Sequence, residues 1–152
     1  MSSMNWPTPL PTEPNALDRA LAMVAEESFF TMVDPVMSHV PDVEGSMLSA
    51  RVTFTGSFSG TLTCRMSRRL AEELIAAFTG EAAPFDATAV DDLAGEFANM
   101  VCGRWLTDVA PSSLFRLEHP VVASVSAREI ASCVPTGLLN GQPIWVALSV
   151  EG

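Results

Sequence analysis

The sequence contains no lysine, and eight arginines supply all of its positive side-chain charge. Eighteen Asp and Glu residues outweigh them, so the net charge is −10 and the pI is about 4.4. The one basic cluster, Arg65, Arg68 and Arg69, is too small to follow a phosphate backbone. Because nucleic-acid affinity rests largely on phosphate neutralisation, we expect no nucleic-acid partner. An acidic protein is instead steered towards surfaces that expose Lys or Arg.

Cysteine is also scarce: Cys64, Cys102 and Cys133 lie far apart in the chain. Their odd number and wide spacing match neither a zinc site nor a disulfide framework. We expect them to be buried apolar residues of a protein in a reducing compartment. His39 and His119 lie in proline-flanked segments outside any cluster of ligands. We therefore expect no metal ion or cofactor of the protein's own.

No apolar run is long enough to cross a bilayer, and the first residues lack the basic and apolar regions of a secretory signal. We expect a cytoplasmic protein without membrane insertion. The 152 residues, 48% of them hydrophobic, suit one compact domain with a substantial core. Four prolines within residues 1–15 predict a flexible N-terminal arm, which leaves residues 16–152 as the single domain.

The periodicity of apolar residues predicts an α+β domain. Short connections between its elements favour an antiparallel β-sheet with helices packed on one face. Residues 127–140 are hard to assign, and a short strand at 130–134 is one interpretation. The predicted elements are, in order, a helix at about 15–33, strands at 47–54 and 58–66, helices at 68–79 and 90–109, and strands at 114–118, 121–126, 130–134 and 144–150.

Capping residues support the helix boundaries. Asn15 or Asp18 can cap the first helix, and Pro35 follows its expected end. Ser67 can cap the second helix, and Gly80 closes it. For the long helix, Asp86 or Thr88 is the expected cap. Apolar positions at helical spacing in the second helix are expected in the core, namely Leu70, Leu74, Ile75 and Phe78.

The helix expected at 90–109 has an orderly polar side. At about 100° per residue, its polar and small residues form one narrow stripe. The stripe consists of Asp92, Glu96, Asn99, Gly103 and Thr107, and the opposite face carries Val90, Ala94, Phe97, Ala98, Val101 and Trp105.

Within the stripe, Glu96 and Asn99 place a carboxylate and a carboxamide side by side. Gly95 and Gly103 flank this pair, and a glycine inside a helix costs about 1 kcal/mol relative to alanine. One explanation is the close approach of another molecule. The other is a solvated face whose glycines ease packing against a neighbouring element, and spacing alone favours it. Asp92, one turn before Glu96, we interpret as a charge favourable to the helix N-terminus.

In this order of elements, the sequence resembles the chemotaxis phosphatase family of CheC, CheX and FliY. The stretch from Glu96 to Gly103 is similar to the family's active-site helix, with E-x-x-N followed by two apolar residues and a glycine. The hairpin at 54–61, leading into the helix that ends at Gly80, resembles the block that precedes the active-site helix. Residues 118–122 resemble the strand start that follows it, and residues 141–150 resemble the closing strand.

The resemblance implies a function. In this family the substrate is the phosphorylated aspartate of a CheY-like response regulator, which itself binds Mg²⁺. Carried onto this sequence, Asn99 would orient the attacking water and Glu96 would pair with the regulator's active-site lysine. Asp92, Gly103 and Thr107 are then candidates for contact with the partner.

One departure bears on the number of sites. CheC-like members carry the Glu and Asn pair on two related helices, whereas here neither Glu26 nor Glu27 has Asn three residues further on. The resemblance therefore implies a single site, as in CheX.

Two alternatives stand beside the phosphatase. The first is a catalytically silent adaptor that keeps the fold and binds a receiver domain or a flagellar signalling partner. The second is a mostly structural homodimer, paired through apolar strand edges near the C-terminus.

Overall fold

The computed structural model describes residues 15–36, 46–130 and 133–151. The predicted flexible arm, apart from Asn15, lies outside these residues, as does His39. The helices are α1 (Ala16–Phe29), α2 (Arg68–Thr79), α3 (Ala87–Val109) and α4 (Ala127–Ile130). The strands are β1 (Val33–Asp34), β2 (Ser46–Thr55), β3 (Ser59–Ser67), β4 (Arg116–Leu117), β5 (Val121–Ser126), β6 (Gly137–Leu139) and β7 (Gln142–Glu151). None of the helices described is long and apolar enough to span a membrane.

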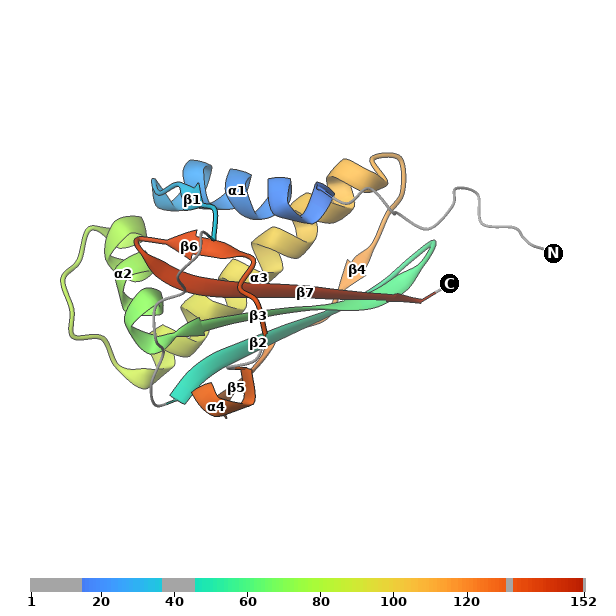
Figure 1. The fold of residues 1–152 in the computed structure, drawn as a ribbon. Coiled ribbons are helices and arrows are strands. Elements are labelled where there is room, and N and C mark those ends of the chain that lie inside the picture. Colours follow the sequence, from blue (N-terminus) through green and yellow to red (C-terminus); the bar gives the residue numbers. More distant parts are fainter. Residues whose placement is uncertain (1–14, 37–45, 131–132, 152) are drawn as a thin grey trace.

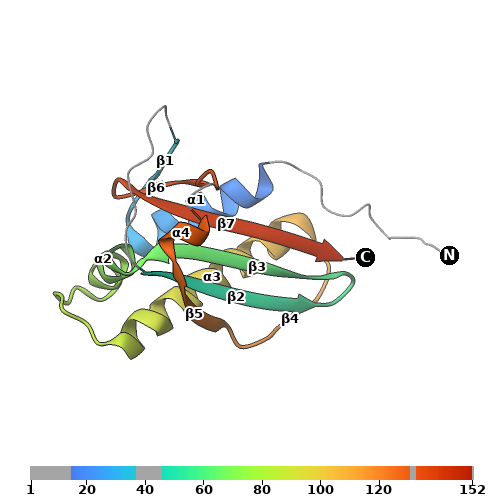
Figure 2. The same cartoon turned by 60° about the horizontal axis from the view of Figure 1, so that its bottom comes forward.

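The described strands form one antiparallel sheet in the order β1-β6-β7-β3-β2-β4. At its centre, Leu62 of β3 lies opposite Val52 of β2 and Leu148 of β7. The outer edge of β2 is shared, because β4 pairs with its C-terminal end and β5 with the residues before it. Figure 2 shows β4 and β5 following one another along β2. The predicted antiparallel α+β fold is confirmed.

The three long helices cover one face of this sheet, with α3 between α1 and the strands (Figure 1). The ring of Phe97 on α3 lies 5.2 Å from that of Phe29 on α1. Further along α3, the Trp105 ring lies 6.0 Å from Phe54 of β2 and 6.1 Å from Phe58. The expected apolar side of the long helix is confirmed, since all six of its residues are buried: Val90, Ala94, Phe97, Ala98, Val101 and Trp105.

The opposite face of the sheet carries a small second cluster under α4, which lies in front of the strands in Figure 2. Because side chains alternate along a strand, Met47 and Trp145 point away from the main core. They pack there with Ala127 and Ile130 of α4. The Trp145 indole donates its N–H to the carbonyl of Cys133 at 3.0 Å. The helices therefore lie mainly, but not only, on one face.

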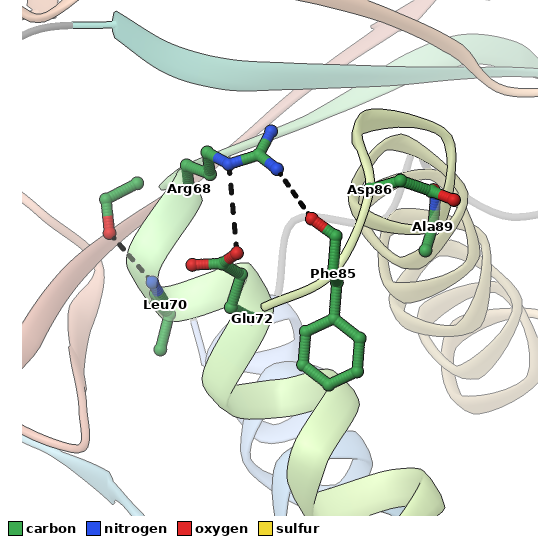
Figure 3. A network of polar contacts seen from close by, with 7 residues as sticks. Arg68, Leu70, Glu72, Phe85, Asp86 and Ala89 are labelled. Atoms are coloured by element: carbon green, nitrogen blue, oxygen red, sulfur yellow. Dashed lines mark hydrogen bonds and ion pairs between the residues drawn. The ribbon is translucent and has the colours of Figure 1, made fainter. Parts of the chain in front are cut away.

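Polar contacts determine where α2 and α3 begin (Figure 3). As predicted, Ser67 caps α2, because its hydroxyl accepts a hydrogen bond from the Leu70 N–H at 3.0 Å. Asp86 caps α3 by accepting the Ala89 N–H at 2.8 Å, so this helix starts at Ala87, earlier than the expected residue 90. Arg68 donates to the Phe85 carbonyl at 3.0 Å and ties the intervening segment to α2.

The predicted end of the first helix is wrong. α1 stops at Phe29 rather than near Val33, because Phe30 adopts a left-handed conformation with φ of 56°. The Thr31 N–H then bonds to the Ala25 carbonyl, which closes the last turn without glycine. Val33 pairs with β6 instead, so Pro35 does not end the helix.

Other predictions fail where the elements are short. Ile130 ends α4, and Cys133 and Val134 lie outside any strand, so the strand proposed at 130–134 is wrong. β6 was not predicted, and the strand expected at 114–118 is reduced to β4. Phe78 is 58% exposed rather than part of the core, although its ring lies 5.4 Å from that of Phe29.

The three cysteines differ in environment. Cys64 and Cys102 are buried as predicted, and burial raises the pKa of each thiol to about 12. Cys133 is exposed, which corrects the expectation that all three are buried.

This difference predicts selective labelling by Ellman's reagent at pH 8. Because the thiolate is the reactive form, we expect Cys133 to react quickly. Cys64 and Cys102, whose pKa values lie well above pH 8 in the folded protein, are expected to react only on unfolding in urea. A Cys133→Ser variant should lose the fast phase. Fast reaction of three thiols per molecule of folded protein would contradict this assignment.

Candidate functional site

The polar stripe of α3 faces solvent, as the spacing predicted. Asp92, Glu96 and Thr107 are exposed, while Asn99 and Gly103 are half-buried. The structure divides the stripe between two neighbouring hollows. Asp92, Glu96 and Asn99 line the first, and Gly103 and Thr107 line the second.

The first hollow contains the Glu96 and Asn99 pair and is open to solvent, with a volume of about 530 Å³. One wall belongs to α3, and the other to the segment that leads into β5. The hollow is lined by Asp91, Asp92, Gly95, Glu96 and Asn99 on α3 and by His119, Pro120 and Val122 opposite.

The second wall is held in place by β2. Val122 lies opposite Ala50 in the β5–β2 ladder, and just before it the Glu118 N–H donates to the Thr53 carbonyl at 2.9 Å. These bonds leave His119 and Pro120 alongside α3. No periodicity predicts this placement, because it depends on pairing with a strand far away in the sequence.

The two glycines of α3 have different roles. A Cβ atom at Gly95 would lie 3.2 Å from Pro120 Cβ and 3.4 Å from Val122 Cγ2, so this glycine lets the second wall approach the helix. Packing against a neighbouring element therefore explains Gly95. A Cβ at Gly103 would meet no atom within 4 Å, so here the helix surface is open.

Carboxylates dominate the charge of the first hollow. Asp91, Asp92 and Glu96 line it, and His119 is the one basic group among its lining residues. Within the described parts of the chain, no residue forms a hydrogen bond or ion pair with the side chains of Glu96 or Asn99. Their polar atoms are thus available to a molecule that enters. The carboxylate can accept from a cation, and the amide can both donate and accept.

Two interpretations of single residues change. Asp92 does not serve the helix N-terminus, because α3 begins at Ala87 and its first turn contains no acidic residue. It lines the hollow beside Glu96 instead. His119, which the sequence did not support as a metal ligand, also lines this hollow. Among the described residues, no group of three or more His, Cys, Asp or Glu side chains is arranged to hold a metal ion.

Comparison of sequences identifies the family. The sequence profile described as "Chemotaxis phosphatase CheX" matches residues 48–141, a range that includes both walls of the hollow. The chain belongs to the CheX family. A search of curated proteins gives no match.

Solved structures share the CheX fold at low sequence identity. The chemotaxis protein CheX from Vibrio vulnificus is 20% identical, with a TM-score of 0.69 over 95% of this chain and 100% of that chain. CheX in the CheX–CheY–BeF₃–Mg²⁺ complex from Borrelia burgdorferi is 16% identical, with a TM-score of 0.66 over 91% and 97%. A CheC-like superfamily protein from Shewanella is 19% identical, with a TM-score of 0.63 over 91% and 96%.

The contrast between the glycines predicts opposite effects on stability. Gly95→Val should lower the free energy of unfolding by about 1–3 kcal/mol, because added methyl groups press on Pro120 and Val122. Gly103→Ala should raise it by up to about 1 kcal/mol, because alanine favours the helix and its Cβ meets open space. Equilibrium unfolding in urea measures both. Changes of the same sign in the two variants would argue against this division of roles.

Proposed function

We propose that this CheX-family protein accelerates hydrolysis of the aspartyl phosphate of a CheY-like receiver domain. The observation that carries the proposal is the open pair of Glu96 and Asn99. The two side chains share one turn of α3, line the same hollow and have no competing partner among the described residues. Membership of a family described as chemotaxis phosphatases names the reaction class that fits this pair.

In this proposal Asn99 acts on the attacking water. Its carboxamide holds the water in line with the phosphorus and the aspartyl oxygen that leaves. Phosphoryl transfer is catalysed mainly by positioning and by stabilising charge, so a neutral amide is sufficient for this role. The water-orienting glutamine of GTPases works on the same principle. The proton of the water and the released phosphate leave through the open side of the hollow.

Glu96 supplies recognition. Its exposed carboxylate pairs with the lysine beside the phosphorylated aspartate of the receiver, and charge-assisted hydrogen bonds of this kind are stronger than neutral ones. Asp91 and Asp92 add negative charge to the same hollow, which favours the approach of a lysine-bearing surface. The Mg²⁺ ion that neutralises the phosphoryl group belongs to the receiver, so this chain supplies no metal ligand.

A solved complex supports the choice of partner. The Borrelia burgdorferi relative, whose fold this chain shares, was crystallised with CheY, BeF₃ and Mg²⁺. At 16% identity, that complex supports the class of partner and not the roles of particular residues.

Loss of the amide should abolish catalysis without loss of the fold. We expect Asn99→Ala to lower the rate of receiver dephosphorylation at least about a hundredfold, because the water is no longer oriented. Alanine is the better helix former, so the free energy of unfolding should not fall. Glu96→Ala should weaken the interaction about ten- to a hundredfold, in line with the loss of a charged hydrogen bond. The measurement is loss of phosphate from a receiver domain labelled with radioactive acetyl phosphate, corrected for its own hydrolysis.

Glu26→Ala is the matched control, since Glu26 is an exposed helical glutamate that lines neither hollow. It should behave as the parent does. If Asn99→Ala keeps the parent's rate, the mechanism is wrong. If the parent binds the receiver without accelerating phosphate loss, the silent adaptor is the better description.

A further inference from the structure

The second hollow lies directly beside the first. Gly103 is one turn beyond Asn99 on α3, and Leu117 lies two residues before His119 on the opposite wall. Residues 113–122 thus run antiparallel to α3, and the two hollows follow one another along this helix; together we call them the cleft. We call the second part, of about 200 Å³, the apolar groove; it is lined by Gly103, Leu106, Thr107, Ala110, Pro111, Ser113, Leu114, Phe115 and Leu117.

The apolar groove differs from the first hollow in chemistry. None of its lining residues carries a charge, whereas three carboxylates line the first hollow. Its floor is formed by Leu106 and half-buried Phe115, and at its rim Leu114 is 93% exposed. On the helix side, Gly103 leaves open space where any other residue would place a Cβ atom. The groove can therefore accept an apolar side chain from outside.

The size of a protein interface determines what occupies the groove. A specific interface covers about 800 Å² on each partner, which corresponds to a disc about 16 Å in radius. At a rise of 1.5 Å per residue, Gly103 and Thr107 are about 6 Å and 12 Å from Asn99 along the helix axis. A receiver domain whose interface is centred on Asn99 therefore also covers the groove.

We infer that the apolar groove is a second docking point for the receiver domain, filled by an apolar side chain that the receiver carries about 6–12 Å from its phosphorylated aspartate. This inference rests on the proposed function, because it takes the position of the receiver from Asn99. The groove provides affinity and holds the receiver in register, while Glu96 and Asn99 perform the recognition of lysine and the positioning of water. Partners that lack the apolar side chain are discriminated against at this point.

The test separates binding from catalysis. Leu114→Asp places a charge at the rim, and Gly103→Leu fills the groove from the helix side. Each should raise KM for a CheY-like receiver phosphorylated with acetyl phosphate about tenfold. A loss of affinity of this size corresponds to leaving about two methylene groups exposed to water. Because neither residue touches the reacting atoms, kcat should stay within about twofold of the parent. Asn99→Ala is expected instead to lower kcat and to leave KM close to the parent's.

Val134→Asp is the matched control, since Val134 is also exposed, at 80%, but lines a different surface beside Trp145. Its KM should equal the parent's. An unchanged KM in both groove variants, with an active parent, overturns the groove and leaves the proposed function standing. An equal rise in KM for Val134→Asp also overturns the groove. So does a result in which Leu114→Asp changes only the molecular mass measured by light scattering and leaves KM unchanged.

If the parent shows no acceleration, the proposed function fails, and binding then decides the inference. Titration calorimetry with the same charged receiver should give a Kd that Leu114→Asp and Gly103→Leu raise about tenfold. An equal Kd for parent and groove variants, or no binding by the parent, overturns the groove as well. Unfolding in urea shows that each variant is folded before either measurement.

Discussion

Burial of one face of α3 is the constraint on which the rest of the structure depends. Phe97 packs on α1, and Trp105 reaches the aromatic side chains of β2 and the hairpin, so the helix is fixed on two sides. A helix held in this way cannot rotate without moving large rings out of a close-packed interior. Its opposite face is therefore presented in a single orientation. Glu96 and Asn99 owe their common direction to residues buried in the core.

Charge differs between the two parts of the open face of α3. The chain has no lysine, and carboxylates outnumber basic side chains among the residues that line the first hollow. The adjoining groove carries no charge. In the proposed complex, the receiver brings a positive group to one end of the cleft and an apolar group to the other. Two different requirements on one surface discriminate between partners better than either alone, because a protein that satisfies only one of them loses binding free energy at the other.

Sequence reasoning succeeded where local rules decide the structure. The Ser67 and Asp86 caps, the hairpin and the buried side of α3 follow from periodicity and capping alone. It failed where less regular contacts decide. β6 pairs with β1, which is distant in the sequence, as well as with β7 across the turn at Asn140 and Gly141, and Phe30 ends α1 in a conformation that non-glycine residues rarely adopt. The site divides in the same way. The stripe on α3 was predictable from spacing, whereas the wall that brings His119 to it depends on pairing with β2.

The way this wall is anchored has a consequence for how the cleft tolerates change in length. β4 and β5 are each in register with β2, through Leu117 opposite Phe54 and Val122 opposite Ala50. The position of the wall therefore does not depend on the length of the turn at 111–113, which lies between α3 and β4. Residues can be added to that turn while the wall remains in place. Between Leu117 and Val121, by contrast, one extra residue would move His119 by a single step of the chain and turn its side chain away from α3.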